Sequence, residues 1–412
     1  MKPGRDPFAG ACPWSASFWQ GKHLFLWLLP VVSAVQATDC YVGKDVPTIA
    51  QAIKAAQPGD TIHLEARVYR DYAGFYNKKG EPGKPITLDG HGATLEGSDP
   101  LDPTQWKEVS PGLFKNEELL PRLDDAILGR WFFLFDGKMN LMGRTSKGRS
   151  APLKNPAELL PGEWTFTKDP PHPGAKPLQI HGSFYIKLAP GRKLEDANIA
   201  VPVRSAGVQF GGDNAHLVIK NLTATHAYND GFNIHGDCRE VEFENIRALE
   251  CGDDGISAHE SAQYRVNGFV STGNSTGICD TGTSQTSYTN VFIAECVGFD
   301  LYFLDDGRYS LKNALVLSSA QNPLSINGRA TGECRMRMDN VCIRRLGGPA
   351  TGLVTSHAVL DAKDCTFENL DVKVTGTAVW TNCLINGTPS AAGATGADLE
   401  SLNALAAKIK TP

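Results

Sequence analysis

The segment Asp230-Gly-Phe-Asn-Ile-His-Gly236 decides the fold, because similar segments return at regular intervals in the second half of the chain. The further copies occupy residues 254–260, 276–282, 300–306 and 322–328. Their first residues are 24, 22, 24 and 22 positions apart (254−230, 276−254, 300−276 and 322−300). A fixed period in this range is typical of a solenoid, in which each coil buries its apolar residues only against the neighbouring coils.

A second strand pattern precedes the repeated segment within each coil. Apolar residues alternate there with polar ones between Gly, Asn and Asp, as in residues 216–223, 240–247 and 290–296. This alternation predicts short strands rather than helices. Two or three strands in a coil of about 22 residues describe a parallel β-helix, whereas a propeller would need a period nearly twice as long. We therefore expect an all-β fold, a single-stranded right-handed parallel β-helix.

The two ends and the middle of the chain depart from the repeat. Residues 46–59 predict a short amphipathic helix that covers the open first coil, with Thr48 as its N-terminal cap. Residues 101–200 are rich in Pro and Trp, and they predict an inserted β-rich subdomain. The expected β-helix domain spans residues 38–390. Residues 391–412 should form a linker and a C-terminal helix that caps the last coil.

The amino-terminal segment, residues 1–37, has the pattern of a secretory signal peptide. Basic residues precede an apolar run at 24–32, small residues follow it, and cleavage is expected before Thr38. The run is too short to span a bilayer. A non-cleaved membrane anchor is the alternative, but no stop-transfer pattern follows the run. We expect a secreted or periplasmic monomer that has no membrane contact after cleavage.

The formal net charge of −5 argues against a nucleic-acid partner, because the chain lacks the basic field that attracts phosphate backbones. Ten cysteines in an exported protein could form disulfides. However, five of them lie inside separate apolar strand patterns, where a thiol acts as a small buried hydrophobe: Cys251, Cys296, Cys342, Cys365 and Cys383. We therefore favour stacked thiols. Removing Cys12 with the signal leaves nine, so at least one would be unpaired in a monomer.

Several segments resemble known enzymes. The predicted cap helix followed by Gly80-Glu-Pro-Gly-Lys-Pro-Ile-Thr-Leu88 resembles the start of pectate-lyase-like right-handed β-helix enzymes. Gly162-Glu-Trp-Thr-Phe166, Phe184-Tyr-Ile-Lys-Leu188 and Val208-Gln-Phe-Gly-Gly212 are similar to segments of β-helix glycoside hydrolases. The resemblance covers most of the mature chain. It implies an enzyme that acts on polysaccharide, as a hydrolase or as a lyase.

Strand alternation predicts which polar side chains face outward. If Phe232 and Ile234 point into the core, then Asn233 and His235 point outward. The same register in the other coils predicts three columns on one outer face. The first column contains His235, His259, Thr281, Asp305 and Asn327, the second contains Asp230 and Asp254 with Asp253 beside them, and the third contains Glu260 and Asp306. Neighbouring members of a column should lie about 4.8 Å apart. Asp280 falls on the inward register, where its charge needs partners.

Paired carboxylates on successive coils suit glycoside hydrolysis, which needs one carboxylic acid and one carboxylate at about 5 Å or about 6.5 to 9.5 Å. We predict Asp254 as the principal catalytic carboxylate and Asp305 or Glu260 as its partner. His235 and His259 would tune these groups or bind sugar hydroxyls. The predicted substrate-binding residues are Asp230, Asn233, Asp253, Asp306, Arg308 and Tyr228. The Asp253-Asp254 pair is similar to that of polygalacturonase-like hydrolases, but their Gly-His-Gly and Arg-Ile-Lys segments are absent.

Two other functions remain open. In a polysaccharide lyase, Asp230, Asp253, Asp254 and Asp306 could bind calcium, whereas a hydrolase would need no cofactor. The outer columns offer only Arg308 as the main candidate for neutralising a uronate, which favours the hydrolase. In a non-catalytic carbohydrate-binding or surface β-helix, the aspartates would be ordinary turn residues. Their concentration in residues 230–308 argues for a site, and a polysaccharide is the expected partner.

Overall fold

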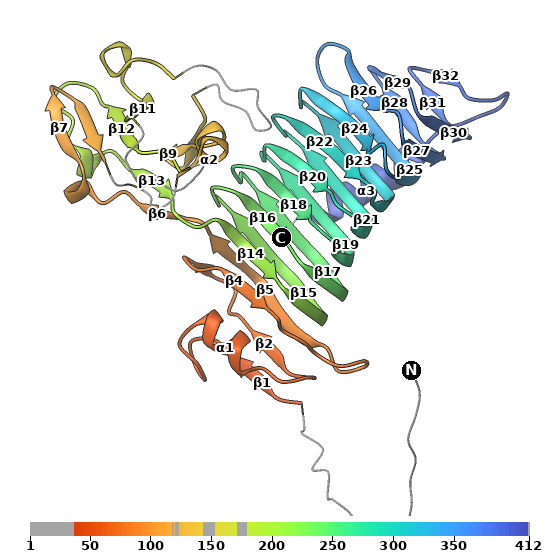
Figure 1. Ribbon diagram of the computed structural model, residues 1–412, viewed down its shortest axis with the longest axis horizontal. Coiled ribbons are helices and arrows are strands. Elements are labelled where there is room, and N and C mark those ends of the chain that lie inside the picture. The colour runs from red at the N-terminus through yellow and green to blue at the C-terminus, as the bar shows by residue number, and fades with distance from the viewer. Residues whose placement is uncertain (1–36, 118, 120–122, 143–152, 171–178, 411–412) are drawn as a thin grey trace, which may run out of the picture. The chain divides into compact units, whose positions relative to one another are not determined.

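The computed structural model describes residues 37–117, 119, 123–142, 153–170 and 179–410. The predicted signal peptide, apart from its last residue, lies outside this part of the chain. No helix in the described part is both long and apolar enough to cross a membrane. The described residues form the predicted right-handed parallel β-helix, whose strands stack coil upon coil in two long sheets (Figure 1).

The first long sheet has nine parallel strands and carries the repeated segments. In sequence order its strands are β4 (Ala73–Tyr76), β14 (Ala206–Gly211), β16 (Asp230–Ile234), β18 (Asp254–Ala258), β20 (Thr276–Asp280), β22 (Phe299–Asp305), β24 (Asn322–Gly328), β26 (Ala350–Val354) and β29 (Leu370–Val374). Each strand pairs with the same strand of the next coil. The outward side chains of successive coils therefore stand side by side.

The second long sheet has fifteen strands and forms the opposite part of each coil. Its strands are β1 (Asp39–Tyr41), β2 (Thr61–His63), β3 (Val68–Tyr69), β5 (Ile86–Glu96), β15 (Asp213–Thr225), β17 (Asp237–Leu249), β19 (Gln263–Thr272), β21 (Gln285–Ala294), β23 (Arg308–Ser318), β25 (Cys334–Arg345), β27 (Ala358–Lys363), β28 (Thr366–Glu368), β30 (Thr377–Thr381), β31 (Leu384–Ile385) and β32 (Thr388–Pro389). One continuous apolar core lies inside the coils.

The insert is a β-rich subdomain with its own aromatic core. Its elements are β6 (Ser98–Pro100), η1 (Pro103–Gln105), β7 (Lys107–Ser110), β8 (Leu113–Asn116), α2 (Asp125–Gly129), β9 (Phe133–Phe135), β10 (Lys138–Asn140), η2 (Pro156–Glu158), β11 (Trp164–Lys168), β12 (Gly182–Lys187), η3 (Leu194–Asp196) and β13 (Ile199–Pro202). Trp131, Phe133, Trp164 and Phe184 pack against one another in this core. Burial of these large rings stabilises the insert.

Of the two helices outside the insert, one lies where the sequence predicts it and the other does not. Helix α1 (Ile49–Ala55) begins after Thr48, whose side chain caps it, and buries Ile49 and Ile53 against the first coil, as predicted. Helix α3 (Leu399–Lys410) was expected to cap the last coil, and this prediction is wrong. It lies against β19, β21 and β23 (Figure 1). The reason is that outward residues of these strands are apolar and need cover: Val270, Phe292 and Leu315 pack with Leu402 and Ala406.

The register of one coil differs from the prediction. The repeat aligns Asp300 with Thr276 and predicts that Asp305 faces outward, but Phe299 is the residue that pairs with Thr276. The core sets this register. Phe303 is 0 % exposed, and a slip by one residue would turn it toward solvent. Asp300 consequently points inward, is 0 % exposed, and has its pKa raised to about 7 by burial.

The described cysteines form no disulfide with one another, in agreement with the stacked-thiol prediction. Cys40 is half-buried, and the other eight are buried. Desolvation raises the pKa of the buried Cys238 and Cys251 thiols to about 12, so both thiols stay protonated at neutral pH. These residues act as small core side chains.

Asp280 points inward as predicted and is satisfied there. It is 0 % exposed, and its carboxyl group accepts hydrogen bonds from the Ala258 amide (3.1 Å), the Tyr264 and Tyr288 hydroxyls (3.2 and 3.0 Å) and the Thr286 hydroxyl (2.6 Å). Burial nevertheless outweighs these bonds and raises its pKa to about 7. The folded protein therefore holds a proton on Asp280 that the unfolded chain releases near its ordinary pKa of 3.8.

We predict that Asp280→Asn flattens the pH dependence of stability. Folding raises the pKa of Asp280, so the protonated carboxyl group contributes to the free energy of unfolding. This contribution is complete below the unfolded-state pKa of 3.8, and it is lost as the pH rises toward about 7. Within this window the group contributes a slope of about −1.4 kcal/mol per pH unit, which the amide abolishes. Urea unfolding at pH 5, 6, 7 and 8 measures the slope. The exposed Asp361→Asn serves as the control, and an unchanged slope in Asp280→Asn would contradict the prediction.

Candidate active site

A local irregularity at the start of the repeated strands turns two aspartates outward. Gly231 faces the core, because a Cβ atom there would lie 2.7 Å from the Cβ of Ala248. The next residue, Phe232, also lies in the core at 0 % exposure. Two successive inward residues break the alternation, so Asp230 lies on the same outer face as Asn233. Gly255 has the same position one coil later, and it places Asp254 in the same way.

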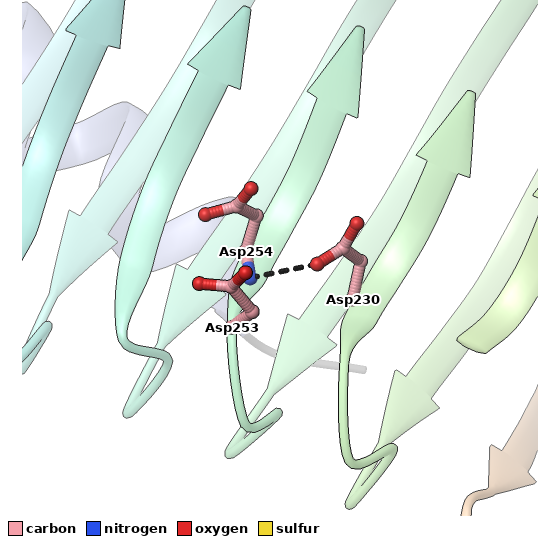
Figure 2. Close-up of side chains that lie close together, drawn as sticks. All are labelled: Asp230, Asp253 and Asp254. Atoms are coloured by element: carbon pink, nitrogen blue, oxygen red, sulfur yellow. Dashed lines mark hydrogen bonds between the residues drawn. The ribbon is translucent and has the colours of Figure 1, made fainter. Parts of the chain in front are cut away.

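Asp230, Asp253 and Asp254 form a compact group that we call the acidic cluster (Figure 2). One carboxylate oxygen from each residue lies within 4.8 Å of the others, and the three residues are 2 %, 7 % and 2 % exposed. The Asp254 amide donates to Asp230 Oδ1 (3.0 Å), and the Ser257 hydroxyl donates to Asp230 Oδ2 (2.9 Å). The cluster joins two neighbouring coils, as the predicted second column required.

The insert supplies a cation that sequence reasoning missed. Arg130 follows helix α2, and its guanidinium lies 3.2 Å from Asp253 Oδ2 while it also donates to the side chain of Asn229. Both partners of the ion pair are largely buried, with side chains 17 % and 10 % exposed. Trp131 packs beside Tyr228 with ring centroids 6.0 Å apart, so the insert contacts the coil that precedes Asp230. The insert does not share the repeat of the coils. The repeat therefore could not predict that Arg130 lies beside Asp253.

Thr276 is a second residue at the site that the sequence analysis did not predict. It lies beside Asp254, on the neighbouring strand. Thr276 pairs with Asp254 across β18 and β20 and is 0 % exposed. Its hydroxyl is buried and makes no hydrogen bond to a described residue. A buried hydroxyl without a partner is uncommon, and this one lies beside the carboxylates of the acidic cluster. Its place in the repeated segment was visible in the sequence, but a lone Thr carries no chemical signal.

Charge repulsion governs the chemistry of the acidic cluster. Three buried carboxylates lie at this separation, and the Arg130 guanidinium lies beside one of them. Each ionised carboxylate in such a group makes ionisation of the next one less favourable. The arrangement can hold a proton between carboxylates, or it can bind a cation. A shared proton makes the group an acid and a base at once. A bound cation would have the hard oxygen ligands that calcium takes.

The predicted histidine column forms a separate group at the other end of the strands. The rings of His235 and His259 stack with centroids 4.0 Å apart, and His235 Nδ1 lies 3.2 Å from the Glu260 carboxylate. Glu260 also accepts from the Gly236 amide (2.9 Å). Burial opposes ionisation of Glu260, but these hydrogen bonds and the histidines outweigh it and lower its pKa. His259 lies five positions after Asp254, which is about 16 Å along a strand. Glu260 lies one residue further on, so it does not pair with Asp254.

Asp305 is not the partner of Asp254 either. The corrected register puts Leu304 in the histidine column and Asp305 beside Gly282. Burial would raise the pKa of Asp305, but hydrogen bonds from Thr281 and Gly282 and the charge of Arg329 lower it. Arg329 Nε lies 2.5 Å from its carboxylate. Asp305 therefore holds neighbouring coils together.

The remaining predicted residues divide between the two faces of the coil. Asn233 is buried next to the cluster, where its side chain accepts from the Ser257 hydroxyl at 3.5 Å. Asp306 follows β22, at the strand end opposite to the cluster. Arg308 begins β23, and with Arg265 and Gln285 it lines a pocket on the fifteen-stranded sheet. The structure thus brings together Asp230, Asp253, Asp254 and Asn233, with Tyr228 nearby, and leaves Arg308 on another face.

Comparisons with known proteins reach the level of the fold only. No family model matches the sequence, and no curated protein matches it. The chain is similar to the solved structure of XylC with xylose at 12 % identity and a TM-score of 0.44, covering 82 % of this chain and 69 % of that one. Pectate lyase Pel9A is similar at 11 % identity and a TM-score of 0.47, and the match covers 87 % of this chain and 83 % of that one. The GH136 lacto-N-biosidase from Eubacterium ramulus is similar at 10 % identity and a TM-score of 0.35, and the match covers 84 % of this chain and 68 % of that one. Likeness this distant assigns no residue and no reaction.

The Arg130–Asp253 pair gives a testable prediction. We expect Arg130→Met to lower the free energy of unfolding by about 3 kcal/mol, because it leaves a buried carboxylate without its cation. Adding Asp253→Asn should recover much of this loss, since the unpaired charge is then gone. Urea unfolding of the two single variants and the double variant measures the coupling. Arg239→Met is a matched control, because its ion pair with Asp213 has side chains 53 % and 43 % exposed. Equal losses in the single Arg130 variant and the double variant would contradict the coupling.

Proposed function

We propose that this protein is a carbohydrate-active enzyme that hydrolyses glycosidic bonds of a polysaccharide at the acidic cluster. One observation carries the proposal: three buried carboxylates from neighbouring coils, with an oxygen of each within 4.8 Å of the others. Burial of this much negative charge lowers stability unless it serves binding or chemistry. A scaffold or spacer would gain nothing from it, which argues against a purely structural β-helix.

Hydrolysis needs a carboxylic acid to protonate the leaving oxygen and a carboxylate to attack the sugar or to activate water. A cluster that shares a proton supplies both forms at neutral pH. Asp254 remains the principal candidate, and its partners are Asp230 and Asp253 rather than Asp305 or Glu260. Arg130 stabilises the ionised form of Asp253, and the Ser257 hydroxyl stabilises that of Asp230. In this proposal the cluster acts as a unit, and the acid and base roles are not assigned to single residues.

A calcium-assisted lyase is the second candidate, because the same three oxygens fit a hard cation. Elimination from a uronate also needs a base and a group that neutralises the substrate carboxylate. On the outer faces of β16, β18, β20 and β22, all of which the structure describes, the sequence supplies neither Lys nor Arg. Arg130, which the insert brings to the cluster, is already paired with Asp253, so we favour hydrolysis. Export from the cell and a monomeric state remain proposals that rest on the sequence.

We expect Asp254→Asn to reduce the turnover of polysaccharide by roughly 10² to 10⁴-fold, because it removes one acid–base group from the cluster. The assay incubates the purified protein with neutral and uronic polysaccharides and measures reducing ends together with ultraviolet absorbance of unsaturated products. If the protein is a hydrolase, we expect new reducing ends without ultraviolet absorbance. Asp361→Asn, an exposed carboxyl on the fifteen-stranded sheet, is the control and should keep full turnover.

Each of the other outcomes contradicts the proposal in a different way. Ultraviolet-absorbing products that require added calcium and disappear with a chelator would establish the lyase. Full turnover of Asp254→Asn would remove the principal carboxylate from the mechanism. No cleavage of any polysaccharide by the wild-type protein would favour a binding module.

A further inference from the structure

Two pairs of aromatic side chains stand on the same outer face as the acidic cluster, on either side of it. The first pair is Phe299 and Tyr302 on β22. Their rings are stacked with centroids 4.2 Å apart and planes inclined by 17°, and both residues are partly exposed. Phe299 continues the row of Asp254 and Thr276, and Tyr302 continues the row of Ser257. The pair is absent from the predicted alignment, because the shifted register of β22 creates it.

The second pair lies at the other end of the face: Tyr72 precedes β4, and Tyr76 is its last residue. Both are exposed large apolar side chains, at 41 % and 56 %. Their rings lie over Gly74, where an added Cβ atom would be 2.8 Å from Tyr76 and 2.9 Å from Tyr72. Gly74 pairs with Gln209, which pairs with Asn233. Glycine at this position lets both rings lie close to the strand.

The two aromatic pairs are placed symmetrically about the cluster. Strand β4 is two strands from β16, which carries Asp230, and β22 is two strands from β18, which carries Asp254. Parallel strands are spaced about 4.8 Å apart, so each pair lies about 10 Å from its carboxylate and the face from β4 to β22 spans about 24 Å. This length accommodates several consecutive sugar residues running across the strands.

The described strands from β4 to β22 carry neither Lys nor Arg. The middle row of this face contains Gln209, Asn233, Ser257 and Cys279, which are neutral. Carboxylates stand at its two edges, with Arg130 beside Asp253 in the acidic cluster and His235 beside Glu260, and these carboxylates would repel acidic substrates. Neutral sugars combine apolar ring faces, which stack on aromatic rings, with hydroxyl groups, which bind amides and hydroxyls.

We propose that this face binds an extended, uncharged polysaccharide that runs across the strands of the nine-stranded sheet. One sugar ring stacks on the Phe299–Tyr302 pair and another on the Tyr72–Tyr76 pair, and the bond to be cleaved lies between them, over the acidic cluster. Such binding on both sides of the cluster implies cleavage inside the polymer rather than at its end. The inference rests on the proposed function for the bond that is cut, but the binding itself can be tested without catalysis.

Binding is measured by calorimetry on Asp254→Asn, so that no substrate is consumed. The probes are neutral hexasaccharides (of xylose, glucose, mannose and arabinose) and, as the charged comparison, hexagalacturonate. We expect at least one neutral hexasaccharide to bind, and hexagalacturonate to bind more weakly. Adding Phe299→Ala with Tyr302→Ala should weaken binding by at least tenfold, and so should Tyr72→Ala with Tyr76→Ala. The matched control is Tyr41→Ala, an exposed tyrosine on β1 of the other sheet, which should bind like its parent.

The outcomes separate the two proposals. Binding that depends on both aromatic pairs, without cleavage by the wild-type protein, supports the glycan face and overturns the hydrolase. No binding of any neutral hexasaccharide, tighter binding of hexagalacturonate, or affinities that neither double substitution changes would overturn the inference. A thermal unfolding curve for each variant shows whether weaker binding comes from lost contacts or from a lost fold. If the alanine variants unfold, Tyr302→Leu and Tyr76→Leu retain the apolar volume and replace them in the test.

Discussion

The inward row of the nine-stranded sheet is the constraint on which the rest of the structure depends. Phe232, Ile256, Ile278 and Leu301 follow one another in register and are each 0 % exposed. Strand side chains alternate, so a slip of one residue would move an entire strand's apolar set to solvent. The buried row thereby fixes the outer face as well. The acidic cluster, the histidine stack and the aromatic pairs all occupy their positions because apolar side chains beneath them occupy theirs.

Carboxyl groups have three distinct roles around this row. Inside the coils, Asp280 is surrounded by hydroxyl donors and holds a proton, because burial raises its pKa to about 7. At the ends of the strands, Glu260 and Asp305 stay ionised and bind the backbone of neighbouring coils. At the start of the strands, the acidic cluster brings three buried carboxylates together, with the Arg130 guanidinium beside Asp253. This third arrangement gathers acid–base groups, or ligands for a hard cation, in one position.

Sequence reasoning predicted the features that have a local pattern and missed those that depend on tertiary packing. The period and the alternation predicted the β-helix, the inward Asp280 and the neighbourhood of Asp230 and Asp254, and the amphipathic pattern capped by Thr48 predicted the first-coil helix. The period misled at β22, where the next strand begins one residue earlier, and only packing of Phe303 reveals it. The predicted pairing of Glu260 with Asp254 fails because their positions lie about 20 Å apart along the chain. Arg130 was invisible, because tertiary packing of the insert alone brings it to Asp253.

In the proposed function, a polysaccharide binds and is cut at the acidic cluster on the nine-stranded sheet. A crystal structure of Asp254→Asn with a bound neutral hexasaccharide tests this proposal. We expect a sugar chain that crosses the strands from β4 toward β22, with a glycosidic oxygen within hydrogen-bond distance of Asp230 or Asp253. A chain bound instead in the groove beside helix α3, lined by Arg247, Lys408 and Ile409, with the outer face of the nine-stranded sheet vacant, would contradict it.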